Sequence, residues 1–86
     1  FLDLQIEEVK VNAGSALAGR SLRQARLQQD LGILVVGIIR PTGELLYNPP
    51  GDTVAEPDAV LIALGQRRHL DQLEKLAAGE ANPGGG

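Results

Sequence analysis

Side chains suited to acid–base or nucleophilic chemistry are scarce in this sequence. There is one histidine, His69, and there is no cysteine. Ser15 and Ser21 lie outside the G-x-S-x-G motif that presents a nucleophilic serine. A serine hydroxyl also needs an adjacent general base to act as a nucleophile, and the sequence offers no such pair. We therefore expect no enzymatic activity and predict no catalytic residue.

Acidic residues and glycines form two further groups that could bind ions. Glu7-Glu8 and the acidic residues between positions 52 and 58 offer carboxylate oxygens, but they lack the alternating spacing of a calcium loop. The glycines between positions 12 and 19 form neither a G-x-G-x-x-G motif nor a phosphate loop with a lysine. Solvated turns are the simpler interpretation of both groups, so we predict no metal ion and no nucleotide-binding fingerprint.

Arg40 is the polar residue best suited to binding. It follows an apolar segment over residues 33–39 and precedes a turn, where its guanidinium could contact a carboxylate or a phosphate with two hydrogen bonds. On the return strand, Tyr47 and Asn48 are expected near the level of Arg40 only if the hairpin is tight, in which case they add an aromatic ring and an amide. These three residues are a candidate pocket rim. The alternative is that Arg40 is a solvated arginine at the edge of a sheet.

Charge and hydropathy restrict the partners of the chain. It has 86 residues, with eleven acidic and eight basic side chains and a net charge of −3. The sequence therefore lacks the basic surface that nucleic acids require, and we predict no nucleic-acid partner. The longest apolar runs, residues 31–39 and 59–64, are shorter than the roughly 20 residues that span a bilayer. The chain begins at Phe1 without a methionine, so we expect it to be part of a longer protein.

The hydrophobic pattern predicts a β-α-β-β-β-α order. This order is typical of an α+β domain with a small, mostly antiparallel sheet and two helices. The predicted strands cover residues 4–11, 33–39, 44–48 and 58–65. The apolar positions of the first strand change parity between Ile6 and Val9, so a β-bulge is expected near Glu7-Glu8.

Short signals position the helices and the hairpin. Ser21 and Gln24 have the spacing of a capping box at a helix start, and Gly32 is suited to the end of that helix. Pro41 and Gly43 indicate a hairpin turn. A second helix is predicted over residues 66–79. The residues expected to face inward from the two helices are Leu22, Ala25, Leu70, Leu73, Leu76 and Ala77.

The strand over residues 33–39 has apolar residues at both odd and even positions, and therefore on both of its faces. An antiparallel sheet of a small domain normally alternates apolar and polar residues, so a strand with two apolar faces must be covered on both. A chain of this length buries only about 60% of its unfolded surface. We therefore expect a homodimer. Strict alternation would separate the strand into two sets, Leu34, Val36 and Ile38 on one face and Ile33, Val35 and Ile39 on the other.

Five segments, in this order, resemble the TrkA-C or RCK-C family, the C-terminal subdomain of units that regulate potassium conductance. They are V-x-V before Gly14-Ser15, LAGRSL at 17–22, VVGIIR at 35–40, NP at 48–49 and VLIALG at 60–65. The Gly-Asp pair usual before the last strand is replaced here by Pro57-Asp58. The resemblance covers nearly the whole chain. Residues 1–79 are therefore predicted to form one domain of this family, and residues 80–86 a flexible tail.

The resemblance implies a dimerising regulatory domain on the cytoplasmic side of a potassium channel, potassium uptake system or cation antiporter. Its partner would be a membrane-embedded transport or channel subunit of the inner membrane. Some family members bind a small ligand between two such domains, so cyclic di-AMP or another small nucleotide is the implied ligand. The alternative is a purely structural dimerisation module with no ligand. The site residues implied by analogy are Ile38, Ile39, Arg40, Tyr47, Asn48 and Pro49.

Overall fold

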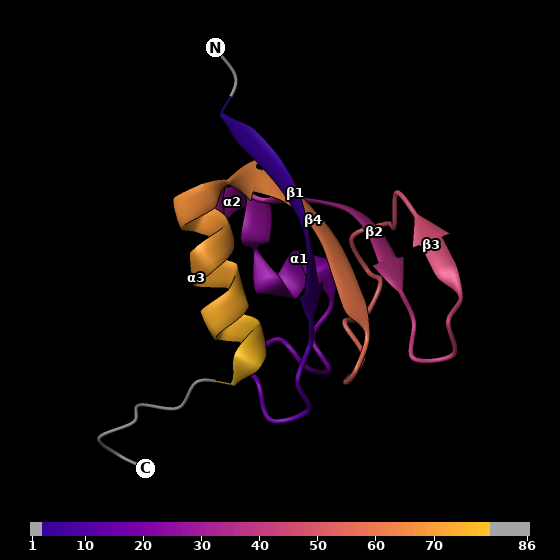
Figure 1. Ribbon diagram of the computed structural model, residues 1–86. Coiled ribbons are helices and arrows are strands. Elements are labelled where there is room, and N and C mark those ends of the chain that lie inside the picture. The colour runs from indigo at the N-terminus through magenta and orange to yellow at the C-terminus, as the bar shows by residue number, and fades with distance from the viewer. Residues whose placement is uncertain (1–2, 80–86) are drawn as a thin grey trace, which may run out of the picture.

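The computed structural model describes residues 3–79, which form one antiparallel sheet with helices on one of its faces (Figure 1). The order of the strands in the sheet is β1-β4-β2-β3. The strands are β1 (Leu4–Lys10), β2 (Leu34–Ile39), β3 (Leu45–Tyr47) and β4 (Val60–Gln66). The helices are α1 (Leu22–Ala25), α2 (Leu27–Leu31) and α3 (Arg67–Ala78). The predicted α+β class is confirmed. The predicted tail, residues 80–86, lies outside the described residues.

The first predicted helix is divided into α1 and α2. The Ser21 hydroxyl accepts a hydrogen bond from the Gln24 backbone, and the Gln24 side chain accepts one from the Ser21 backbone, so the predicted capping box is confirmed. Arg26 then adopts a left-handed conformation with φ 52°, which ends α1. Gly32, with φ 67°, ends α2 as predicted. The chain therefore makes a corner at Arg26.

The turns before and after β3 and before β4 use the left-handed region. Gly43 has φ 92° in the hairpin turn, in agreement with the predicted role of a glycine there. Asn48 and Asp58 also have positive φ, 50° and 72°. The positive φ of the turn before β4 therefore falls on Asp58, and Pro57 keeps the negative φ that its ring requires.

The β-bulge of the sheet lies in β2. β1 pairs with β4 along its whole length without a register shift, so the bulge predicted near Glu7-Glu8 is wrong. The register shifts instead between Val35 and Gly37 of β2. This shift reverses the alternation within the strand. Leu34 and Ile38 consequently face opposite sides of the sheet, and the strict alternation predicted for this strand is also wrong.

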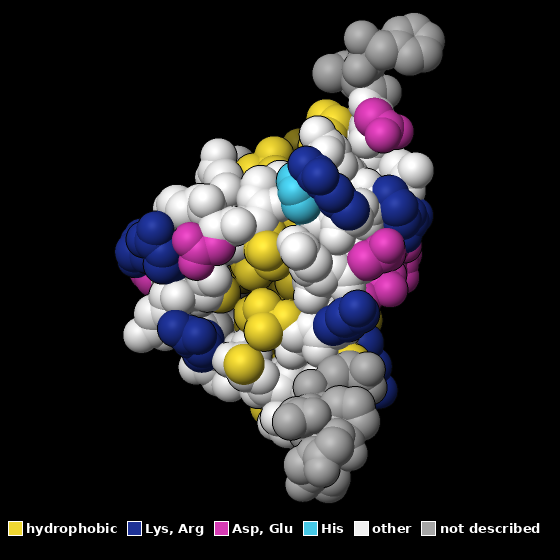
Figure 2. Space-filling model, turned by 90° about the vertical axis from the view of Figure 1, so that its left-hand side faces the viewer, with side chains coloured by type: hydrophobic (Ala, Val, Ile, Leu, Met, Phe, Trp, Pro, Cys, Tyr) yellow, Lys and Arg dark blue, Asp and Glu magenta, His cyan; other side chains and the backbone are white. Residues whose placement is uncertain are grey.

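The core lies between the helices and the inner face of the sheet. In α3, Leu70, Leu73 and Ala77 are buried as predicted, whereas Leu76 is 36% exposed. Viewed from the side of α3, apolar side chains gather in the middle of the helical face and charged side chains surround them (Figure 2). No helix in residues 3–79 is long and apolar enough to cross a membrane. The largest fully buried side chains are those of Val11, Leu17, Ile33, Ile38, Leu61, Leu70 and Leu73.

The opposite face of the sheet, called the outer face below, is mostly apolar and is not covered by helices of the described chain. Ile6, Leu34 and Leu45 on this face are 63%, 49% and 57% exposed. Strand partners in an antiparallel sheet lie side by side on the same face. The outer face is therefore formed by four rows, Leu4–Gln66, Ile6–Leu64–Leu34, Glu8–Ile62–Gly37–Tyr47 and Lys10–Val60–Ile39–Leu45.

Candidate functional site

The β2–β3 hairpin separates the residues of the predicted pocket rim. The Arg40 backbone N–H donates to the Glu44 carbonyl at 2.8 Å, so the turn is tight. Tyr47, however, pairs with Gly37 rather than with Arg40. At about 3.3 Å per residue, Tyr47 lies about 10 Å along the sheet from the level of Arg40. The expectation that Arg40, Tyr47 and Asn48 share one level is therefore wrong.

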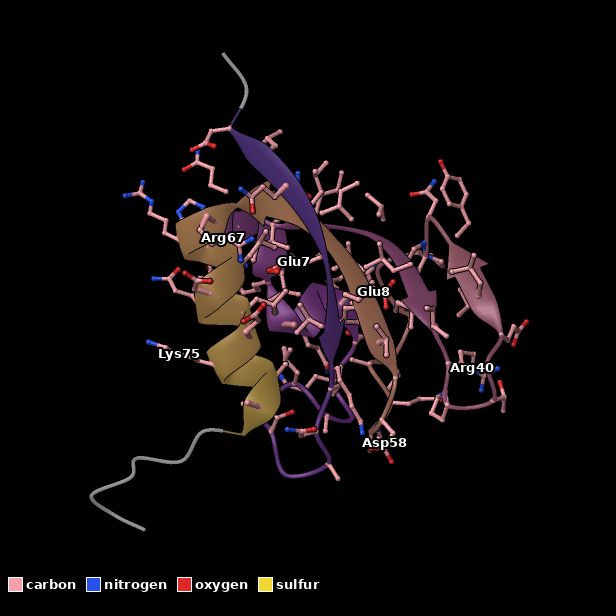
Figure 3. The ribbon with its side chains drawn as sticks, in the orientation of Figure 1. Glu7, Glu8, Arg40, Asp58, Arg67 and Lys75 are labelled. Carbon is pink, nitrogen blue, oxygen red and sulfur yellow. The ribbon has the colours of Figure 1, made fainter. Side chains whose placement is uncertain are left out.

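The Arg40 guanidinium lies between two carboxylates. Its Nε and Nη2 atoms donate to Glu56 at 3.3 and 3.2 Å, and Nη1 donates to Glu44 at 3.1 Å. The hydrogen bond with Glu56 is the main cause that raises the pKa of Arg40 above its usual value. Arg40 lies at the turn end of the hairpin, and this network joins the hairpin to the segment before β4 (Figure 3). All three guanidinium nitrogens of Arg40 therefore already donate to a carboxylate, which leaves the group less available to an anion than an unpaired arginine.

The other predicted site residues lie in three different environments. Ile38 is 1% exposed and belongs to the core. Ile39 and Tyr47 lie on the outer face, where Tyr47 is 82% exposed. Asn48 occupies the left-handed turn after β3. Pro49 lines a cleft on the other side of β2. The six residues therefore follow the course of the hairpin and do not converge on one point.

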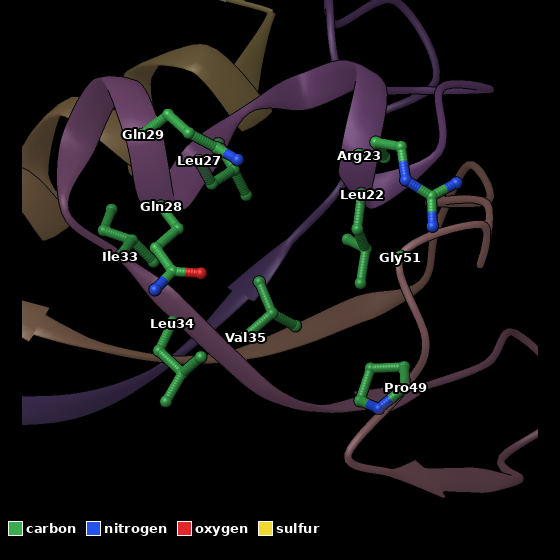
Figure 4. A pocket seen from close by; sticks show the side chains of 10 residues that line it. All are labelled: Leu22, Arg23, Leu27, Gln28, Gln29, Ile33, Leu34, Val35, Pro49 and Gly51. Carbon is green, nitrogen blue, oxygen red and sulfur yellow. The ribbon is translucent and has the colours of Figure 1, made fainter.

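The cleft beside Pro49 has a volume of about 270 Å³. It lies between β2 and the corner that α1 and α2 form at Arg26 (Figure 4). Its side chains are mostly apolar, and Arg23 and Gln28 lie at opposite ends of it (Figure 4). Leu34 lines the cleft and also belongs to the outer face, so the two surfaces adjoin. The lining residues are Leu22, Arg23, Leu27, Gln28, Gln29, Ile33, Leu34, Val35, Pro49 and Gly51.

Arg23 provides the positive charge of this cleft. Its backbone N–H donates to the Gly51 carbonyl at 2.8 Å, and its side chain extends beside Gly51 (Figure 4). The guanidinium forms no ion pair with a residue in the range 3–79. Sequence reasoning missed Arg23. Its position against Gly51 depends on a long-range contact, and nothing in the local sequence distinguishes it from Arg20 or Arg26.

A second group of charged side chains joins β1 to α3. Arg67 Nη1 lies 2.7 Å from Glu7 Oε1 and 3.5 Å from Asp71 Oδ1. The hydrogen bond from Arg67 lowers the pKa of Glu7. The same Glu7 carboxylate, through a hydrogen bond and its charge, raises the pKa of Glu74. Within residues 3–79, no three side chains of the metal-binding types are grouped to hold an ion.

Known proteins share both the sequence and the fold of this chain. The model of the TrkA-C domain family matches residues 6–78. The K(+)/H(+) antiporter subunit KhtT of Bacillus subtilis (strain 168) is 37% identical over 73 residues, which are 85% of this chain and 44% of KhtT. This chain therefore spans less than half of that relative.

Two solved structures have the same fold. The RCK C domain of the potassium transport protein KtrA, in complex with cyclic di-AMP, has a TM-score of 0.76 and 26% identity, covering 85% of this chain and 82% of that one. The RCK_C domain dimer of S. agalactiae BusR, also in complex with cyclic di-AMP, has a TM-score of 0.79, covering 91% and 95%. Its identity of 18% is evidence for the fold alone.

Proposed function

The chain belongs to the TrkA-C domain family, as its motifs predicted, and we propose on this basis that it is a regulatory domain of a potassium channel, potassium uptake system or cation antiporter. The names of its relatives support this role, since KhtT is an antiporter subunit and KtrA a potassium transport protein. We propose that the domain acts in the cytoplasm on a membrane-embedded transport subunit, without catalysis of its own and without a nucleic-acid partner.

The apolar outer face is the observation that carries the proposal of a homodimer. Ile6, Leu34 and Leu45 are about half exposed or more and lie on one continuous surface. Large contiguous apolar patches mark interaction sites. In a two-fold dimer the same face meets itself. Glu8 and Lys10, which have opposite charges and lie on this face, could then pair between copies.

The ligand proposed for the domain is cyclic di-AMP or a related small nucleotide. The complexes of KtrA and BusR with cyclic di-AMP support this choice. The cleft of about 270 Å³ is smaller than the usual range for a drug-sized ligand, about 300–1,000 Å³. A ligand with two identical halves would gain a second cleft from the second copy. Because Leu34 belongs to both the cleft and the outer face, a copy docked on the outer face would lie next to the cleft.

The six residues expected from the sequence remain the proposed site, in two roles. Four of them would border the ligand. Ile39 and Tyr47 would do so from the outer face, Asn48 from the turn after β3, and Pro49 from the cleft. The other two would hold the hairpin in place. Ile38 does so by packing in the core, and Arg40 by its hydrogen bonds to Glu44 and Glu56.

Calorimetric titration of cyclic di-AMP into the purified chain tests this function, with AMP as the control nucleotide. We expect saturable binding of cyclic di-AMP at one molecule per two chains and weaker binding of AMP, which can fill only one cleft. A dimer that binds neither nucleotide would instead support a purely structural dimerisation module. The engagement of Arg40 by two carboxylates favours that alternative.

A further inference from the structure

We propose that Arg23 is the phosphate-binding residue of the cleft between α1–α2 and β2, an assignment that rests on the ligand-binding role proposed above. The ligand class is a phosphate ester with a flat, weakly polar group, as in a nucleotide. The sequence suggested Arg40 for the phosphate contact, and the structure provides grounds to prefer Arg23.

The first ground is the availability of the two guanidinium groups. Arg40 donates hydrogen bonds to Glu44 and Glu56, so two negative charges already surround its positive charge. Arg23 forms no ion pair with any residue from 3 to 79, and its side chain is exposed. An arginine without a carboxylate partner can donate two parallel hydrogen bonds to a phosphate. In a chain with net charge −3, anion binding also depends on a local positive group of this kind.

The second ground is how the backbone positions Arg23. Two reciprocal hydrogen bonds between Ser21 and Gln24 fix the first turn of α1, in which Arg23 lies. The Arg23 N–H donates to the Gly51 carbonyl and joins this turn to the loop that follows Pro49. The origin of the side chain is therefore fixed at the edge of the cleft, while the guanidinium is free to meet a ligand (Figure 4).

The third ground is the chemistry of the remaining lining. Leu22, Val35 and Pro49 give the cleft apolar surfaces on which a flat ring can lie (Figure 4). Gln28 lies at the opposite end of the cleft from Arg23 (Figure 4), and its amide can both donate and accept hydrogen bonds. Apolar walls with a few polar groups at defined positions are typical of small-molecule sites.

Gly51 offers a way to move the Arg23 guanidinium without removing its charge. A Cβ added at Gly51 would lie 2.9 Å from Arg23 Nη2, which is closer than a real Cβ contact. The contact is with the far end of a flexible side chain, and the φ of Gly51 lies outside the range that disfavours alanine. Gly51→Ala should therefore preserve the fold and displace the guanidinium.

Calorimetric titration of cyclic di-AMP into four versions of the full chain tests the assignment. These are the wild type, Arg23→Ala, Gly51→Ala and the control Arg68→Ala, which removes one positive charge from α3, outside the cleft. Hydrogen bonds to charged groups are among the strong ones, so Arg23→Ala should raise the Kd about ten- to a hundredfold. Gly51→Ala should raise it by a smaller factor, and Arg68→Ala should leave it within about twofold. Circular dichroism checks that each variant is folded.

The outcomes separate this assignment from the function on which it rests. If the wild type binds cyclic di-AMP and both cleft variants bind it equally well, Arg23 is not a ligand contact and the ligand-binding role stands. If Arg23→Ala does not fold, Gly51→Ala decides alone, and wild-type affinity in that variant would overturn the assignment. If the wild type binds neither cyclic di-AMP nor the control nucleotide AMP, the assignment and the ligand-binding role are both wrong.

Discussion

Replacing two exposed apolar residues of the outer face should dissociate the proposed dimer while the single chain remains folded. Ile6 on β1 and Leu45 on β3 are 63% and 57% exposed and do not line the cleft. Threonine suits a strand at both positions but has less apolar surface. Complete burial of such a side chain contributes about 1.5–3 kcal/mol. Only the exposed part would become buried in the dimer, so each substitution should weaken the free energy of dimerisation by about 1 kcal/mol.

The effect should be large because each residue occurs twice in a two-fold dimer. The four substituted side chains of the dimer should together weaken the free energy of dimerisation by about 4 kcal/mol. Because about 1.4 kcal/mol corresponds to a factor of ten, the dissociation constant of the dimer should rise by roughly several hundredfold. Sedimentation equilibrium over a concentration series measures this constant. Leu76→Thr is the control, because Leu76 is a partly exposed apolar residue of α3, away from the outer face. A double variant that dimerises as tightly as the wild type would refute the proposed interface.

Two further predictions concern the core and the charged group between β1 and α3. Leu61 is completely buried in β4, so Leu61→Ala should lower the free energy of unfolding by about 2–5 kcal/mol in urea denaturation, and a loss below about 1 kcal/mol would contradict its position in the core. Glu7 raises the pKa of Glu74, which means that folding disfavours the ionised form of Glu74 at neutral pH. Glu74→Gln should therefore raise the melting temperature at pH 7 and lose this advantage once the pH falls below about 4.3, the ordinary glutamate pKa; equal melting temperatures at pH 7 would contradict this.

Local signals in the sequence were sufficient to predict most of the elements. The capping box of Ser21 and Gln24, the helix end at Gly32 and the hairpin turn at Gly43 each depend on a few neighbouring residues, and the structure confirms all three. The apolar stripe of α3 was also predictable, apart from Leu76, because a helix repeats its buried positions every three or four residues.

Features that depend on long-range pairing were not predictable in this way. The change of parity in β1 is not caused by a β-bulge. It arises because Ile6 lies on the outer face, which is largely apolar, and Val9 lies in the core, so both faces of the strand carry apolar residues. A change of parity cannot distinguish a bulge from a strand with two apolar faces. The proximity of Arg23 to Gly51 joins segments that are distant in the sequence, and no local pattern predicts it. The candidate site was therefore predicted along the hairpin but not as a three-dimensional cleft.

Native mass spectrometry of the wild-type chain with excess cyclic di-AMP is the most direct test of the account, which holds that this domain is a dimer with a shared nucleotide. The account predicts a dominant species of two chains with one bound nucleotide, because each chain contributes one cleft of about 270 Å³ beside the outer face. Single chains at high protein concentration, or dimers that stay free of nucleotide when it is saturating, would contradict it.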